Sequence, residues 1–263
     1  MAWFRRRREA CLPPARHVTV PVDGLLLRAS ISGSGPPLVL VHGLGTSGRC
    51  WTHNLDALSR FATLYVVDLP GFGESDTPDE VLAPDRLADS LMRWCLAMDL
   101  QKASFLGHSL GGEVCLWFAA RYPTMVDRLI VACSTGWPRM SLAHRLRGLV
   151  LDGVREPMHF LPTLFEAYAQ AGPLRMLKTI QASRPEALAM EMATISAPTL
   201  VVWGGRDPVI TLDEARAMAI AIPKARLAII EEGAHGLIFG APRRFNRLVC
   251  QFLAEAAVTT ANR

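Results

Sequence analysis

A serine stands where an apolar run gives way to an amphipathic one. Residues 103–106 are largely apolar, residues 107–111 read Gly-His-Ser-Leu-Gly, and a helix-like pattern begins at Leu110. A strand-to-helix turn of this kind holds the serine in a strained backbone conformation. Glycines suit both sides of it, because a Cβ there would collide with the neighbouring strand or helix. The hydroxyl of Ser109 would then lie near a helix N-terminus, where free N–H groups and the helix dipole favour negative charge.

A serine hydroxyl is a poor nucleophile at neutral pH and needs a base to take its proton and a carboxylate to orient that base. Asp207 follows the apolar run 199–203, and His235 follows the run 225–230. Ligands of parallel sheets bind outside the carboxyl ends of the strands, so we expect Ser109, His235 and Asp207 to meet there. Asp68 is a rival acid, but the Pro-Gly-Phe-Gly that follows at 70–73 suggests that it holds a turn.

Other groups are expected at the same edge of the sheet. A tetrahedral oxyanion needs two or more fixed donors, and we expect the backbone N–H groups of Leu44 and Leu110 to supply them. His42 precedes a glycine in the first of these loops and is expected to have a structural role. His108, beside the serine, should point its ring away from the hydroxyl and serve packing or hydrogen bonding.

Short apolar runs alternate with amphipathic ones along most of the chain. This alternation predicts an α/β fold, a doubly wound and mostly parallel sheet with helices on both faces and an N-terminal β-hairpin. The expected strands are residues 17–22, 25–31, 38–41, 63–67, 103–106, 128–133, 199–203 and 225–230, and the expected helices are 51–61, 84–98, 110–121, 212–222 and 242–256.

The alternation stops between residues 137 and 194, where helix-like segments are separated by prolines. We therefore expect a core domain of residues 17–136 and 195–263 and a helical cap of residues 137–194. Residues 1–16 are expected to be a flexible basic segment, able at most to touch an anionic surface weakly. Its four arginines, Arg5–Arg8, account for the whole net charge of +4, which gives no general case for a nucleic-acid partner.

Composition excludes several further classes. No apolar run approaches the roughly 20 residues of a membrane span, so no stable membrane insertion is expected. The six cysteines have no metal-like spacing, and Cys133 is one of four that we interpret as small core residues. The sequence thus predicts a cytoplasmic protein with neither a metal nor a cofactor.

In combination, these motifs resemble the α/β-hydrolase superfamily, in its branch of esterase-like enzymes with a serine nucleophile. The matching features are His42-Gly43, residues 68–75, residues 107–112, residues 204–207, and His235 followed by Pro242 and a helix. The resemblance implies a helical cap inserted after the sixth strand of the core. The serine at position 109, in the strand-to-helix turn, argues against epoxide hydrolases and haloalkane dehalogenases, which use an aspartate there.

The expected function is a serine hydrolase that cleaves an apolar carboxylic ester, or a thioester or lactone, through an acyl-enzyme. Phe160, Phe165 and Tyr168 of the cap are expected to line the acyl pocket. The alternatives are a carbon–carbon bond hydrolase of the meta-cleavage type, a cofactor-free perhydrolase, and a non-catalytic ligand receptor on the same fold. The first would use a cap arginine to hold a substrate carboxylate, with candidates at Arg139, Arg145, Arg147, Arg155 and Arg175. Oligomeric state is left open by these patterns.

Overall fold

A computed structural model describes residues 15–137, 147–148 and 168–261, and the side chains among these up to residue 255. Its strands form an eight-stranded sheet in the order β1-β2-β4-β3-β5-β6-β7-β8. The antiparallel pairs are β1–β2 and β2–β4, and the remaining neighbours are parallel. The strand bounds are β1 Arg16–Val22, β2 Leu25–Gly33, β3 Pro37–Val41, β4 Thr63–Val67, β5 Ala103–His108, β6 Val126–Ala132, β7 Thr199–Gly204 and β8 Ala225–Ile230. The predicted fold class, including the N-terminal hairpin, is confirmed.

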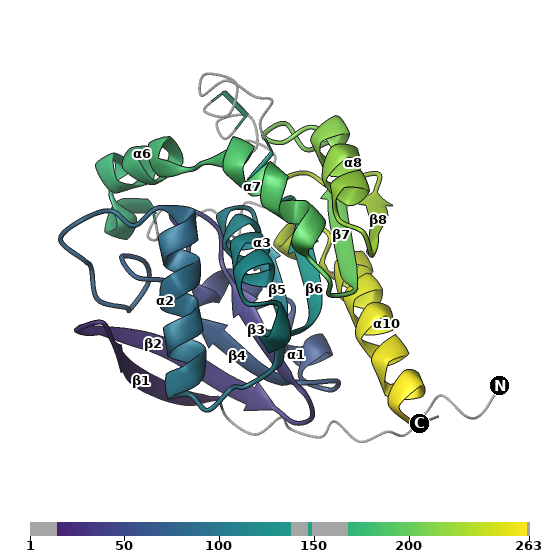
Figure 1. Ribbon diagram of the computed structural model, residues 1–263, viewed down its shortest axis with the longest axis horizontal. Coiled ribbons are helices and arrows are strands. Elements are labelled where there is room, and N and C mark those ends of the chain that lie inside the picture. Colours follow the sequence, from purple (N-terminus) through teal and green to yellow (C-terminus); the bar gives the residue numbers. More distant parts are fainter. Residues whose placement is uncertain (1–14, 138–146, 149–167, 262–263) are drawn as a thin grey trace.

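Helices cover both faces of this sheet. The pair α2 and α3 packs side by side on one face, in front of the central strands (Figure 1). On the other face α1 packs against α10, and the ring of Trp51, at the end of η1, lies 6.5 Å between centroids from the ring of Phe245 in α10. The bounds are η1 Gly48–Trp51, α1 Leu55–Leu58, α2 Pro84–Ala97, α3 Leu110–Arg121, η2 Pro123–Met125, α6 Pro173–Ala182, α7 Pro185–Glu191, η3 Met192–Thr194, α8 Leu212–Ala221, α9 Leu237–Gly240 and α10 Pro242–Ala261.

Local sequence explains the elements that position the site. The strands β3 and β5 are apolar and buried along nearly their whole length, as expected for central strands covered on both faces. Pro84 occupies the first turn of α2, where its missing N–H costs nothing. Thr211 and Glu214 form a reciprocal capping box at the start of α8, which fixes where the chain after β7 becomes helical.

The helix predicted over residues 51–61 is wrong. The chain forms the short 3-10 helix η1 and the single turn α1 instead. Between them Asn54 is fully buried, and its side-chain amide donates to the carbonyl of Ile238 at 2.9 Å and to the side chain of Asn246 at 2.7 Å. These bonds to a distant part of the chain fix the break, because a buried NH2 group without an acceptor would be costly.

The described part of the predicted cap lies beyond the carboxyl ends of the parallel strands (Figure 1). Both α6 and α7 begin with a proline in the first helical turn, at Pro173 and Pro185. The helix α7 packs on α3, the helix that follows the serine turn. The predicted flexible segment 1–16 lies outside the described residues except for its last two. Among the helices that the structure describes, none is long and apolar enough to cross a bilayer.

Candidate active site

Ser109 connects β5 to α3 in a conformation that few residues adopt. Its φ is +53° and its ψ is −118°, a combination that costs of order 1–3 kcal/mol unless the surroundings enforce it. The surroundings are backbone: a Cβ at Gly107 would overlap with the carbonyl of Gly111, and a Cβ at Gly111 would overlap with the carbonyl of Val41. The two glycines therefore let the strand, the turn and the helix approach closely enough to form the predicted turn.

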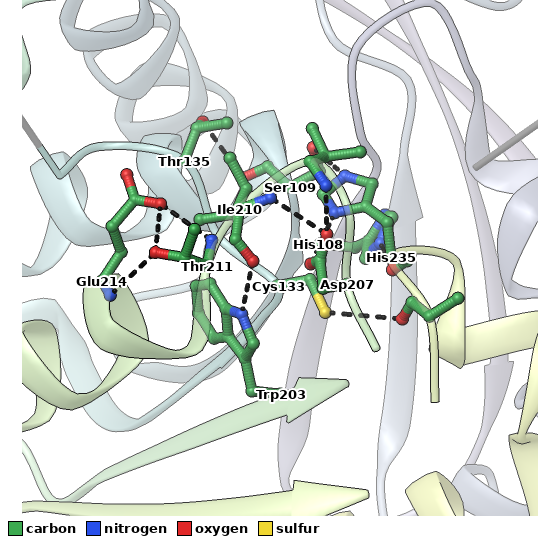
Figure 2. Close-up of polar contacts among 12 residues, drawn as sticks. His108, Ser109, Cys133, Thr135, Trp203, Asp207, Ile210, Thr211, Glu214 and His235 are labelled. Atoms are coloured by element: carbon green, nitrogen blue, oxygen red, sulfur yellow. Dashed lines mark hydrogen bonds and ion pairs between the residues drawn. The ribbon is translucent and has the colours of Figure 1, made fainter. Parts of the chain in front are cut away.

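The structure brings Ser109, His235 and Asp207 together in one line of hydrogen bonds (Figure 2). His235 Nε2 lies 2.9 Å from Ser109 Oγ, and His235 Nδ1 lies 2.9 Å from Asp207 Oδ2. A carboxylate accepts only, so the ring donates from Nδ1 and offers Nε2 as the acceptor for the serine hydroxyl. The side chains of His235 and Asp207 are 6% and 1% exposed, so little water competes for these bonds.

Asp207 is held as a buried anion. Burial opposes its ionisation, but the charge and hydrogen bond of His235 and the N–H groups of Ile210 and Val209 outweigh it and lower the pKa of Asp207. Those two N–H groups donate to Oδ1 at 3.0 and 2.8 Å, leaving Oδ2 for the histidine. Trp203 supports the same loop by donating from its indole to the carbonyl of Ile210 at 3.1 Å.

The loop after β7 is fastened to the loop after β8, which explains how Asp207 and His235 meet. Arg206 N donates to the carbonyl of Gly233 at 2.9 Å, and Gly205 N donates to the carbonyl of Ile230 at 2.9 Å. A Cβ at Gly204 would overlap with the carbonyl of Ala234. The Gly-Gly pair at 204–205 thus permits the approach that carries the acid to the base.

His108 holds the backbone of the histidine loop. Its Nε2 donates to the carbonyl of His235 at 2.9 Å, and the two rings lie 5.2 Å apart between centroids. Burial, with the neighbouring His235 as the next cause, lowers the pKa of His108 to about 3. The ring is therefore neutral at ordinary pH and acts through packing and hydrogen bonding, as its position in the sequence indicated.

The rival acid Asp68 lies elsewhere and bridges two loops. Its Oδ1 accepts from Gly48 N at 2.7 Å, and its Oδ2 accepts from Glu74 N at 2.9 Å. His42 joins the same region to the loop after β3: its Nδ1 donates to the carbonyl of Gly43 at 2.8 Å, and its Nε2 accepts from Leu69 N at 3.0 Å. Burial is the main cause that lowers the pKa of His42, so it too is neutral.

The two predicted oxyanion donors lie on segments that flank the serine. Leu110 is the first residue of α3, so its N–H has no partner inside the helix. Leu44 belongs to the loop after β3, and that loop packs against the serine turn, because a Cβ at Gly43 would be 3.3 Å from the Cβ of Ser109. The loop after β3 and the start of α3 thus both reach the serine, as an oxyanion site there requires.

Of the three aromatic residues predicted to line a pocket, Phe160 and Phe165 lie outside the described residues. Tyr168 lies against the loop after β3, where its Cδ1 would be 2.7 Å from a Cβ at Gly45. Among the cap arginines, Arg147 is exposed, and Arg175 donates to the carbonyl of Pro78 at 3.1 Å. The candidates Arg139, Arg145 and Arg155 lie outside the described residues.

Cys133 is buried in the core, as expected, and it also lies beside the site. It follows β6 with a φ of +43° and donates to the carbonyl of Ala234 at 3.8 Å. One ligand atom each from Cys133, Asp207 and His235 lie within 4.8 Å of one another. These are zinc-ligand types, but two of them already share a hydrogen bond, so an ion would have to displace its proton. The place of Cys133 directly after a buried strand was the signal that could have found it.

Glu113, one turn beyond Ser109, is a second residue that the sequence reasoning missed. It is 1% exposed, although a glutamate in an amphipathic run is usually solvated. Its carboxyl group accepts hydrogen bonds from the hydroxyls of Thr135 and Ser183. Only its sequence position, directly behind the serine turn, could have drawn attention to it.

Comparison with known proteins identifies the family of this chain. A human (lyso)-N-acylphosphatidylethanolamine lipase is 31% identical over 171 residues, covering 62% of this chain and 48% of the lipase. An uncharacterised protein of Mycobacterium tuberculosis is 27% identical over 291 residues, covering 94% of this chain and 85% of that protein. The structure of an N-acyl homoserine lactone degrading enzyme superimposes with a TM-score of 0.78 at 25% identity, covering 89% of this chain and 100% of that one. A model of the alpha/beta hydrolase family matches residues 38–248, and the chain belongs to that family.

Proposed function

We propose that this protein is a serine hydrolase that cleaves a carboxylic ester, thioester or lactone through an acyl-enzyme. The observation that carries the proposal is the unbroken line of hydrogen bonds from Ser109 Oγ through His235 to Asp207. Family membership supports a hydrolase, and two of the similar proteins are named for a lipid and a lactone substrate.

The first half of the reaction transfers the acyl group to the enzyme. Ser109 Oγ attacks the acyl carbon while its proton passes to His235 Nε2, and the oxygen of the carbonyl becomes an anion. The N–H groups of Leu44 and Leu110 stabilise this anion, with the N-terminal dipole of α3 behind Leu110. Asp207 stabilises the imidazolium that forms. The proton on Nε2 then goes to the leaving alcohol or thiol as the bond to the acyl carbon breaks.

In the second half, a water molecule takes the place of the alcohol. His235 Nε2 accepts its proton, the hydroxide oxygen bonds to the acyl carbon, and the acid is released as Ser109 recovers its proton. Every proton that leaves a nucleophile is thus returned to a leaving group, and Asp207 stays ionised throughout. The lowered pKa of Asp207 is consistent with that role.

The test uses an organophosphonate probe and the variant Ser109→Ala. The probe should label Ser109 alone, and the variant should lose labelling and at least about 10⁴-fold in kcat for 4-nitrophenyl acetate, with its circular dichroism unchanged. Label on another residue, or an active Ser109→Ala protein, would contradict the assignment. Steady turnover beyond the first equivalent distinguishes an enzyme from a receptor, and faster cleavage of a dienone acid than of any ester would favour carbon–carbon bond hydrolysis.

A further inference from the structure

The buried carboxyl group of Glu113 has no part in the proton transfers proposed above. It lies on α3, four residues after Ser109, in a place where α7 covers the helix. Burying a carboxyl group is costly unless hydrogen bonds compensate, so its partners reveal what holds it there.

Among the described residues, two hydroxyl groups from different parts of the chain donate to it. Thr135, which follows β6, donates from Oγ1 to Oε2 at 2.6 Å, and Ser183, between α6 and α7, donates from its hydroxyl to Oε1 at 2.5 Å. These lengths are typical of hydroxyls that donate to a charged oxygen. We call this pair of hydrogen bonds the Glu113 link.

At one end the link reaches the serine turn. Thr135 N donates to the carbonyl of Ser109 at 3.2 Å, and Glu113 N donates to the same oxygen at 3.2 Å; Figure 2 shows Thr135 in contact with the turn. At the other end the link holds Ser183, the residue at which α6 has ended and α7 is about to begin. One carboxyl group therefore connects the backbone of the serine to a corner of the insertion above it.

Within the described part of the chain, α6 has another polar attachment at its opposite end. Arg175, in the first turn of that helix, donates to the carbonyl of Pro78. The side chain of Met176 lies against Gly45, with its sulfur 2.9 Å from where a Cβ would be. Near Ser183 the apolar contact comes from Leu188 of α7, which is buried and lies against Gly136. Among the described residues, the corner at Ser183 is thus held by the apolar contact of Leu188 and by the Glu113 link.

We propose that Glu113 is a positioning residue that fixes the corner between α6 and α7 above Ser109 and thereby sets which acyl groups the enzyme accepts. The selectivity part rests on the proposed function, whereas the positioning part does not. Loss of the link leaves the hydrogen bonds of Ser109, His235 and Asp207 in place, so it acts on the fit of long substrates and not on the chemical step.

The experiment compares Ser183→Ala with Thr194→Ala. Both changes delete one hydroxyl of the insertion, but Thr194 is exposed, and among the described residues its hydroxyl donates to the carbonyl of Glu191 in its own turn. Amide hydrogen exchange of residues 173–191 should become about tenfold faster in Ser183→Ala and stay unchanged in Thr194→Ala. Glu113→Gln keeps an acceptor and should exchange more slowly than Glu113→Ala.

Kinetics with 4-nitrophenyl acetate and 4-nitrophenyl decanoate test the selectivity. Ser183→Ala should raise KM for the decanoate about tenfold and leave kcat for the acetate within twofold. Unchanged exchange in Ser183→Ala, or an equal rise in Thr194→Ala, would overturn the link. A faster exchange with the same decanoate-to-acetate ratio would overturn the selectivity role. If no ester is turned over through Ser109, the proposed function fails, and the exchange data alone decide on the link.

Discussion

Replacing His108 with glutamine should make the protein less sensitive to acid. The ordinary pKa of a histidine is 6.5, and burial lowers the pKa of His108 to about 3. Below pH 6.5 the unfolded chain therefore binds a proton that the folded protein does not. His108 therefore costs no stability above pH 6.5, and its cost grows as the pH falls from 6.5 towards 3.

The size of the effect follows from the same shift. At pH 5, which is one and a half units below the ordinary pKa, protonation of this histidine in the unfolded chain alone lowers the free energy of unfolding by about 2 kcal/mol. Glutamine places an amide donor near the position of Nε2, so the bond to the carbonyl of His235 can persist while the titration is removed. Whatever its stability at pH 8, His108→Gln should lose about 2 kcal/mol less between pH 8 and pH 5 than the unsubstituted protein.

Urea unfolding followed by tryptophan fluorescence at both pH values measures this difference. His42 is buried with a lowered pKa and is present in both proteins, so its contribution is common to the comparison. The exposed His17 of β1 supplies the matched control, because His17→Gln removes an imidazole that water solvates in either state. An equal loss of stability in His108→Gln and the unsubstituted protein would show that the reasoning about burial is wrong.

Two more predictions concern the candidate acid and the cap. Asp207→Asn should lower kcat by on the order of 10³–10⁴-fold because the histidine loses its carboxylate. Asp68→Asn should chiefly lower the melting temperature, by roughly 3–10 °C, because two loop N–H groups lose an anionic acceptor. A larger fall in kcat for Asp68→Asn than for Asp207→Asn, per folded molecule, would reassign the acid. Replacement of Phe160, Phe165 or Tyr168 by alanine should change the acyl-length profile of kcat/KM in at least one variant; identical profiles in all three would argue against an apolar acyl pocket formed by these rings.

The parts of the fold that could be predicted are those whose cause is local. A central strand such as β3 is apolar along its length because both faces are covered, and the turn at Ser109 needs glycines that are visible in the sequence. The positions of Asp207 and His235 followed from one rule, that polar residues directly after buried strands meet at one edge.

The parts that could not be predicted depend on distant partners. Periodicity over residues 51–61 says nothing of the bond between Asn54 and Ile238, which are 184 positions apart. The burial of Glu113 depends on the cap, and nothing in α3 itself shows that Ser183 will lie above it. Cys133 has an apolar neighbourhood in sequence, and only the assembled loops bring its sulfur to the carbonyl of Ala234.

The strand order also bears on how the protein acquires its reactive centre during synthesis. The sheet grows outward from β3 in chain order on one side, through β5, β6, β7 and β8, so each later strand can add to an edge that already exists. His235 follows Ser109 by 126 positions, and at roughly 5–20 residues per second the ribosome needs about 6–25 s to add them. During that interval the serine turn can form before His235 is available as its base. The serine of a nascent chain therefore lacks its base, and it becomes a strong nucleophile only after β8 has joined the sheet and His235 has reached it.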